Sequence, residues 1–444
     1  MRRWPGLAIA LVAGAHGAAK AGETTMDHYT VRAGDTLAML ERTGLAGHGA
    51  LARVVRINHI RSPRLLQIGQ VLRIPRDLLR DEGTWATVET FSGPVALSLR
   101  GQPLPTRTGV TIGEGAHIQT GRNGFVTLRL RDASAVSLPS QSDVTIARLR
   151  HVLLTGAVER EFTLADGRAH MTVTPMTLPD STFRVVTPLS VSAVRGTDFR
   201  VDYAAADQTA VTAVEEGRVA VDALHTATQA PLAQPSLVSA GLGLAISPQG
   251  VGVPTKLLPP PVLEDVGRVQ TAAQLGFRVT TTSAATAYRA QISRDAGALD
   301  VIAETRQTSP DLAFASIPPG TWFLRLASID PQGIEGAAES YTFDRYRNEV
   351  HGTMGQATQR RHHIYQFKWS GVADGPVRYR FRLWREGQDT TPTVDEIGLH
   401  GNALDVRDLA PGKYHWQIAS ILLVGHRVIE SRSPEQSFQI AQPR

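Results

Sequence analysis

Short stretches in which apolar and polar residues alternate constrain this chain more than any other feature of its sequence. They recur between residues 88 and 246, and Phe125–Arg131 is a clear case. Period-two alternation is typical of half-buried β-strands, and glycine, aspartate and asparagine separate the stretches as they do at turns. No useful helical pattern occurs here. The region is therefore predicted to be all-β, as a sandwich, barrel or β-solenoid, and not a fold of alternating strands and helices. Similar alternating runs are Phe183–Val186, Phe199–Tyr203, Val211–Val214 and Val219–Val221.

The C-terminal part contains an internal repeat. Ile317–Ile329 aligns with Leu409–Ile421, 92 residues later, and both segments place an aromatic strand directly after a Pro-Gly turn. A β-rich period of about 90 residues is the size of an immunoglobulin-like or fibronectin-like sandwich. We therefore predict two such repeats, at residues 263–345 and 346–444.

Aromatic residues in these repeats have two interpretations. Trp322, Tyr414 and Trp416 would form a sugar-binding platform if they were exposed. They alternate with aliphatic residues on predicted strands, which favours positions in the sandwich cores.

The N-terminus has the pattern of a secretory signal peptide. Arg2 and Arg3 precede the apolar run Leu7–Ala15, and Ala19–Ala21 offers a small-residue cleavage site. The run is much shorter than the roughly 20 residues that span a bilayer. We therefore expect a signal peptide at residues 1–21 and an exported protein of the periplasm or cell envelope, with no integral membrane segment after cleavage.

Composition excludes several classes of protein. The 444 residues are enough for two to four domains. Because the chain has no cysteine, disulfides, thiolate metal sites and cysteine nucleophiles are excluded. The net charge of +5 favours anionic partners. Nucleic acid is not expected as a partner, because the basic residues are dispersed and the N-terminus indicates export.

Residues 28–76 show a separate βααβ pattern. His28–Val31 predicts a strand, and a first helix begins near Leu37 with Asp35 or Thr36 as its N-cap. Apolar residues spaced three and four apart predict a second helix near Leu51, and a closing strand follows. The same residues resemble a LysM module. The resemblance is carried by Tyr29–Leu37, Ile57–Asn58 and Leu66–Pro75.

The LysM resemblance implies a shallow groove that binds peptidoglycan or another glycan containing N-acetylglucosamine. By position, two loops would line this groove. Their backbone amides would hydrogen-bond to the acetamido group of the sugar, and Leu37 and Ile60 would contact the methyl of that group. Asp35 and Thr36 also suit helix capping, which is compatible with glycan contact. The implied glycan-binding residues are Gly34, Asp35, Thr36, Leu37, His59, Ile60, Arg61 and Ser62.

Residues 88–246 resemble a FecR-type domain. The resemblance rests on Val194–Val201, which contains an Arg-Gly-Thr-Asp-Phe block, and on Val214–Val221, with earlier matches at Gly113–Gly121. Members of that family relay signals from an outer-membrane transporter to a sigma factor. Arg195 and Asp198 have two interpretations: they contact a protein partner, or they form an ion pair that fixes the turn at Gly196.

The sequence contains no recognisable catalytic or metal-binding pattern. His362 and His363 are adjacent on a predicted strand, where neighbouring side chains point to opposite faces and make a poor chelate. Glu215 and Glu216 diverge for the same reason and are predicted to lie in a solvated turn. No Gly-x-Ser-x-Gly motif is present. The sequence predicts no enzyme, no cofactor and no metal site.

The sequence as a whole predicts a mainly β, multidomain, non-enzymatic envelope protein that binds peptidoglycan and presents β domains to an unknown envelope protein. The alternative is a periplasmic sensor or regulator of FecR type, acting in transporter or sigma-factor signalling. The predicted segments are a signal peptide (1–21), a LysM module (28–76), a FecR-like β domain (88–246), a proline-rich linker (247–262) and two sandwich repeats (263–345 and 346–444).

Overall fold

The computed structural model is mainly β, as predicted, with two short α-helices in its described part. The predicted signal peptide and Ser62 lie outside the described residues. The chain forms two compact units, described separately here: Met1–Pro259 with Ile329–Ala337, and Pro260–Ser328 with Ala338–Arg444. The described residues are 25–61, 66–225, 228–231, 234–266, 269–281, 284–315, 317–359 and 362–442.

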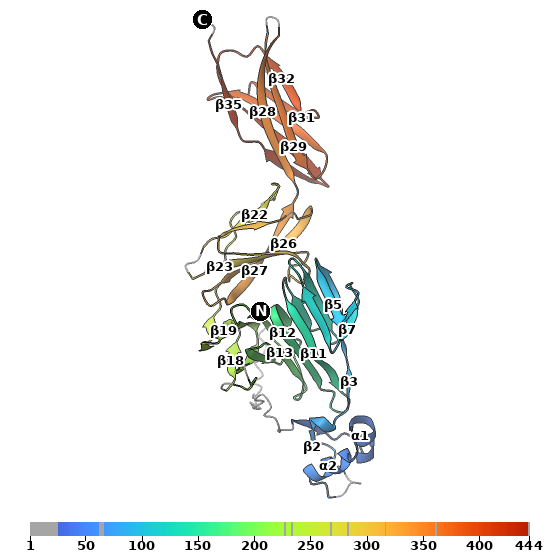
Figure 1. Ribbon diagram of the computed structural model, residues 1–444. Coiled ribbons are helices and arrows are strands. Elements are labelled where there is room, and N and C mark those ends of the chain that lie inside the picture. The colour runs from blue at the N-terminus through green and yellow to red at the C-terminus, as the bar shows by residue number, and fades with distance from the viewer. Residues whose placement is uncertain are drawn as a thin grey trace, which may run out of the picture. The chain divides into compact units, whose positions relative to one another are not determined.

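The first unit begins with the predicted βααβ arrangement (Figure 1). Its two strands pair antiparallel, with Tyr29 opposite Leu72, and the amphipathic faces of both helices pack on them. A short 3-10 helix, η1 (Arg76–Leu78), leads into the next strands. The elements are β1 (Met26–Thr30), α1 (Leu37–Gly44), α2 (Ala50–Ile57) and β2 (Val71–Pro75).

Nineteen strands, β3–β21, follow in the described part of the first unit before Pro259. One sheet has the order β6-β5-β8-β11-β12-β13-β14-β17-β18, and β3 also pairs with β11. The strands as far as β12 are β3 (Asp81–Gly83), β4 (Trp85–Ser92), β5 (Val95–Leu99), β6 (Gln102–Leu104), β7 (Thr111–Gly113), β8 (Ala116–Thr120), β9 (Phe125–Leu130), β10 (Ala135–Leu138), β11 (Asp143–Val152) and β12 (Val158–Thr172).

A second sheet shares the long strand β12 with the first. Its order is β7-β4-β9-β10-β12-β15-β16-β19, and β19 also pairs with β20 and β21. The remaining strands of this unit are β13 (Thr182–Val186), β14 (Ser190–Val194), β15 (Asp198–Ala204), β16 (Thr209–Glu216), β17 (Arg218–Ala223), β18 (Ser236–Ser239), β19 (Leu242–Ser247), β20 (Gly250–Val251) and β21 (Thr255–Lys256).

Both sheets contribute to one aliphatic and aromatic core, in which Ile118, Phe162 and Phe199 are fully buried. This arrangement follows from the alternation in the sequence, because every second residue of each strand points inward. The predicted strands near Phe125, Phe183, Phe199, Val211 and Val219 are all confirmed. Residues 247–262, predicted as a linker, contribute β20 and β21 to the second sheet, because their backbone groups pair with β19.

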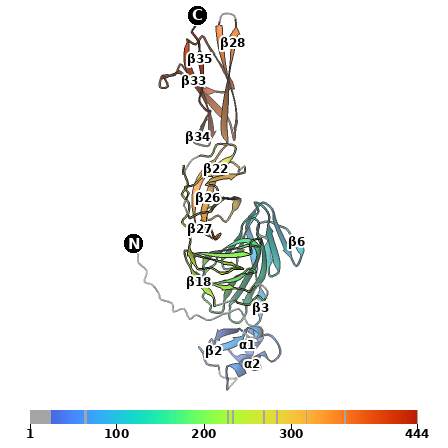
Figure 2. The same cartoon turned by 60° about the vertical axis from the view of Figure 1, so that its left-hand side comes forward.

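The second unit contains two groups of strands, each with its own core. The first group comprises sheets β22-β25 and β24-β23-β26-β27, and the second comprises β28-β29-β32 and β31-β30-β33-β34, with β35 paired to β33 (Figure 2). The strands are β22 (Leu275–Arg278), β23 (Ala287–Ser293), β24 (Val301–Gln307), β25 (Asp311–Phe314), β26 (Gly320–Ile329), β27 (Glu335–Arg345), β28 (Asn348–Gln359), β29 (His362–Ala373), β30 (Val377–Arg385), β31 (Val394–Leu399), β32 (Ala403–Arg407), β33 (Gly412–Val424), β34 (Arg427–Arg432) and β35 (Gln436–Ile440).

The aromatic residues of the repeats lie in these cores. Trp322 is 6% exposed, and Tyr414 and Trp416 are 3% and 1% exposed, so the prediction that they are core residues is confirmed. Trp416 packs edge-on against Phe367, with ring centroids 5.0 Å apart, a favourable aromatic geometry. Among the described residues, no helix combines the length and apolar character needed to cross a membrane.

Candidate functional site

The loop between β1 and α1 is held in place by its own side chains. The Asp35 carboxylate accepts a hydrogen bond of 2.6 Å from the Tyr29 hydroxyl and another of 2.6 Å from the backbone N–H of Arg32. Gly34 has φ +91°, a conformation that favours glycine, and nothing lies within 4 Å of where its Cβ would be. The loop is therefore fixed internally and presents an open backbone.

Thr36 is the N-cap of α1. Its hydroxyl accepts a hydrogen bond of 3.2 Å from the N–H of Met39, which satisfies one of the free donors at the start of the helix. Of the two N-cap residues that the sequence offered, the structure selects Thr36. Asp35 instead orders the preceding turn, and burial together with Asp35 raises the pKa of Tyr29 to about 12.

The second loop follows α2 and is anchored by Asn58. The Asn58 side-chain NH₂ donates hydrogen bonds to the carbonyls of Val54 and Arg73, at 2.9 and 2.8 Å. The Asn58 side-chain oxygen accepts a hydrogen bond of 2.7 Å from the backbone N–H of Arg73. One side chain thus joins the end of α2 to β2. His59 follows with φ +50°, which is unusual for a residue with a side chain. This conformation turns the chain sharply at the start of the loop.

The predicted glycan-binding residues differ in exposure. Gly34, Thr36, His59 and Arg61 are exposed, and Asp35 and Ile60 are half-buried. Leu37 is only 3% exposed and belongs to the core of the βααβ region. The Leu37 side chain is therefore not available for the predicted contact to an acetamido methyl group, whereas Ile60, the other residue of that prediction, is only half-buried. Ser62, the last of the eight, lies outside the described residues.

The βααβ region is joined to the larger sheets by a charged cluster. The Arg76 guanidinium donates at 2.6 Å to Glu159 on β12 and at 2.5 Å to Asp81 on β3. Arg76 and its partners are largely shielded from water, and the hydrogen bonds of Glu159 and Asp81 raise the pKa of Arg76 against the opposing effect of burial. The loops on either side of α1 and α2 therefore belong to a region with a fixed attachment to the larger sheets.

Arg195 and Asp198 have different partners. The Arg195 guanidinium donates to the backbone carbonyls of Pro179 and Leu178, at 2.5 and 2.6 Å. The Asp198 carboxylate lies 2.5 Å from His170 Nε2. It also accepts a hydrogen bond of 3.2 Å from the Thr172 hydroxyl. The interpretation in which Arg195 and Asp198 form an ion pair with each other is therefore wrong. Arg195 instead holds the segment before β13 against the turn.

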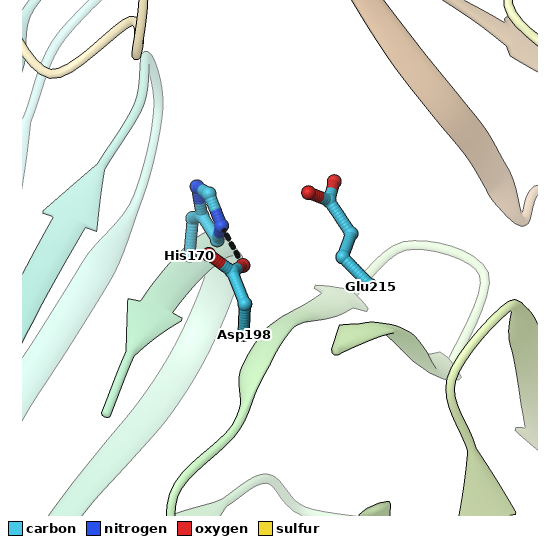
Figure 3. Close-up of side chains that lie close together, drawn as sticks. All are labelled: His170, Asp198 and Glu215. Atoms are coloured by element: carbon cyan, nitrogen blue, oxygen red, sulfur yellow. Dashed lines mark hydrogen bonds and ion pairs between the residues drawn. The ribbon is translucent and has the colours of Figure 1, made fainter. Parts of the chain in front are cut away.

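A cluster of titratable side chains that the sequence did not reveal lies on the second sheet. His170 on β12, Asp198 on β15 and Glu215 on β16 each place one ligand atom within 4.8 Å of the others (Figure 3). Glu215 also lies 3.0 Å from the guanidinium of Arg200. The prediction that Glu215 occupies a solvated turn is wrong, because β16 extends through it and its side chain is only 24% exposed.

Two family models match this chain. Residues 29–75 match the LysM domain, and residues 116–220 match the FecR protein family. No curated protein matches. The chain therefore carries a LysM domain followed by a FecR domain. Both are families of non-catalytic binding or regulatory domains that are typical of extracytoplasmic and envelope proteins, LysM being associated with glycan binding and FecR with envelope signalling.

Several solved structures are similar to parts of this chain. A candidate anti-sigma factor from Parabacteroides distasonis is 16% identical, with a TM-score of 0.26 over 32% of this chain. This chain spans 59% of the length of that structure. Chicken tenascin fibronectin type-III domains are 14% identical, with a TM-score of 0.23 over 41% of this chain and 100% of the other. The FN1–FN3 domains of chicken CNTN1 are 12% identical, with a TM-score of 0.21 over 57% of this chain and 95% of theirs.

Proposed function

We propose that this chain is a non-enzymatic protein of the cell envelope that binds peptidoglycan through the two loops of its LysM domain. The FecR domain and the C-terminal strands then present surfaces to an envelope protein partner. The observation that carries the proposal is the LysM match over residues 29–75, together with two exposed loops whose backbones are fixed by Asp35 and Asn58.

The chemistry of the loops suits an N-acetylated sugar. Exposed backbone N–H and C=O groups near Gly34 offer hydrogen-bond partners to an acetamido group, and Ile60 offers an apolar contact to its methyl. Because Asp35 and Asn58 already hold these loops, little conformational entropy is lost on binding. A single shallow site of this kind binds weakly, so a second attachment through the other domains strengthens retention by effective concentration.

Binding to insoluble peptidoglycan tests the proposal. The full chain is compared with Thr36→Asp, at low and high salt. Aspartate caps a helix as well as threonine does, so this variant keeps α1 intact while it places a carboxylate at the exposed start of the helix. We expect the parent chain to bind at both salt concentrations, and Thr36→Asp to lose most of its binding.

Thr43→Asp is the matched control, because it makes the same chemical change at an exposed position of the same helix. It should bind like the parent chain. Loss of all binding at high salt would instead indicate adsorption by the net charge of +5. Equal binding by the parent chain and Thr36→Asp would remove the LysM loops from the proposal.

A second candidate function is supported by the FecR match over residues 116–220. In this case the chain is a sensor or regulator in transporter or sigma-factor signalling, and the LysM domain only fixes its location. Arg195 and Asp198 would then lie beside the partner-binding surface. Transcript profiles of cells with and without the gene discriminate the two functions. A change confined to one transporter regulon supports the regulator, and unchanged transcripts contradict it.

A further inference from the structure

Three neighbouring strands of the second sheet bring His170, Asp198 and Glu215 to one face. In the antiparallel register of β12 and β15, His170 lies opposite Arg200, and Thr172 lies opposite Asp198. On β16, Ala213 lies opposite Arg200, and Glu215 follows two residues later on the same face. A shift of register between Asp198 and Phe199 adds an extra residue of β16 at this point.

The three side chains are positioned by regular secondary structure and are mostly shielded from water. Their exposed fractions are 21% for His170, 23% for Asp198 and 24% for Glu215. Each offers a ligand atom within 4.8 Å of the other two, and Figure 3 shows the Glu215 carboxylate on its own strand beside the hydrogen-bonded pair. Ligands on strands are held more precisely than ligands on loops.

One imidazole and two carboxylates form a ligand set that zinc and related divalent transition metals prefer. Bonds of 2.0–2.2 Å place neighbouring ligand atoms of a tetrahedral zinc site about 3.4 Å apart. The ligand atoms lie within 4.8 Å of one another, so metal binding requires the longer separations to close to this value by side-chain rotation. Three protein ligands leave a fourth position for water.

Charge also favours a cation here. Arg200 is buried and lies 3.0 Å from a carboxylate oxygen of Glu215 and 3.0 Å from one of Glu335, so one guanidinium is shared by two carboxylates. Asp198 adds a third carboxylate on the same face, and His170 is its hydrogen-bonding neighbour. A divalent ion between Asp198 and Glu215 would interact favourably with both carboxylates.

Arg200 does not prevent Glu215 from turning toward a metal. Its guanidinium also donates to the backbone carbonyls of Glu335 and Gly336, at 2.9 and 2.7 Å. If Glu215 moves away, Arg200 keeps three hydrogen bonds to residues 335 and 336, including that to the Glu335 carboxylate at 3.0 Å. The rearrangement therefore leaves no buried charge without a partner.

We propose that His170, Asp198 and Glu215 bind one divalent transition-metal ion of the zinc class, which ties β12, β15 and β16 together. The bound ion replaces the hydrogen bond between His170 and Asp198 by two metal–ligand bonds and draws in Glu215. An ion that binds only the folded sheet raises the stability of that sheet by linkage.

The test is titration of the full chain with Zn²⁺ after removal of metals with a chelator. Isothermal titration calorimetry measures affinity and stoichiometry, and Co²⁺ in place of Zn²⁺ gives visible absorption bands if the site is tetrahedral. We expect one saturable site that is weakened at least about 10-fold in His170→Gln and in Glu215→Gln, since even changes around the ligands of a metal site cost this much.

His117→Gln is the matched control. His117 Nε2 lies 2.7 Å from Asp143, an analogous histidine–aspartate pair, but that pair is not part of a three-ligand group in the described chain. This variant should keep the affinity of the parent chain. Circular dichroism and thermal unfolding of the metal-free proteins show whether each variant folds, and Co²⁺ spectra give a second measurement for any variant of reduced stability.

Two results would overturn the proposal. One is the absence of saturable binding by the folded, chelator-treated parent chain. The other is a parent-like affinity and Co²⁺ spectrum in both His170→Gln and Glu215→Gln, which would assign any bound ion to other histidines of the chain. Neither result bears on peptidoglycan binding, because the LysM loops contain none of these ligands.

Discussion

The guanidinium of Arg200 lies 3.0 Å from the carboxylate of Glu335, a residue 135 positions later in the chain. Both side chains are nearly inaccessible to water, at 6% and 7% exposure. The segment Ile329–Ala337, which contains Glu335, is therefore held in the first unit by a buried ion pair and by the hydrogen bonds of the same guanidinium to its backbone. Buried pairs fix geometry more than they add stability.

We predict that Arg200→Met strongly destabilises this contact, by about 3 kcal/mol, because the Glu335 carboxylate then remains buried without its guanidinium partner. Hydrogen exchange at the N–H of Ala337, which donates to the carbonyl of Leu258, measures the local effect. Arg278→Met removes the exposed ion pair with Asp311 and should leave exchange unchanged. Unchanged protection of Ala337 in Arg200→Met would show that the pair does not hold the segment.

Asp27 predicts a pH dependence of stability in the first unit. Burial, followed by the nearby charge of Asp180, raises the pKa of Asp27 to about 7. Glu159 also raises it, whereas Arg76 and His28 lower it. Since the folded chain keeps this proton more tightly than the unfolded chain, the stabilising contribution is complete below about pH 4 and is lost as the pH rises to 7.

Asp27→Asn replaces this carboxyl group by a neutral group of the same shape. The variant should raise the free energy of unfolding at pH 8 by up to about 4 kcal/mol and flatten its dependence between pH 4 and 7. Urea unfolding at several pH values measures both effects. Asp77→Asn, at an exposed aspartate paired with Arg53, is the control and should keep the slope of the parent chain. A parent-like slope in Asp27→Asn would contradict the assignment.

Gly196 predicts a steric effect in the Arg-Gly-Thr-Asp-Phe block. It has φ +120°, and a Cβ there would lie 2.6 Å from the Cα of Pro175, which the backbone cannot relieve cheaply. Gly196→Ala should therefore destabilise the FecR domain by more than the roughly 1 kcal/mol of backbone strain alone. Gly241→Ala, at φ +78° with nothing within 4 Å, is the comparison for a positive-φ glycine without a close neighbour. Equal thermal shifts in the two variants would exclude a steric role for Pro175.

The sequence predicted those features that depend on local pattern. Alternation fixes which side of a strand faces the core, so the β regions and the buried Trp322 and Trp416 followed from periodicity. Three blocks of residues in order identified the LysM domain, and the spacing of apolar residues placed its helices. Residues 247–262 were misassigned because prolines indicate loops but do not exclude short strands between them.

Contacts between distant segments could not be predicted. His170 and Asp198 are 28 residues apart, and Glu215 follows on a third strand, so no motif joins them. Arg195 and Asp198 lie close in sequence, yet their partners come from other segments. Leu37 was expected to face a sugar because it follows the loop, but it is the first inward position of α1 and is buried.

The Asn58 side chain holds the loop after α2 in place, so variants here distinguish the position of that loop from direct contact between its residues and the glycan. This side chain makes three hydrogen bonds that join α2 to β2. Asn58→Ala removes all three, so we expect a loss of about 2 kcal/mol in stability, together with weaker peptidoglycan binding, because residues 59–61 lose their anchor. Thermal unfolding and the peptidoglycan pull-down measure the two effects on one sample.

His59→Gly is the complementary variant. Glycine accepts φ +50° without strain, so this change removes the imidazole and leaves the loop where it is. We expect unchanged or slightly higher stability, and binding that falls only if the imidazole itself contacts the glycan.

If Asn58→Ala has the unfolding temperature and the peptidoglycan binding of the parent chain, the Asn58 side chain does not position the loop. If it loses stability but keeps its binding, the glycan site lies elsewhere on the domain, because the loop that Asn58 anchors is then dispensable for recognition.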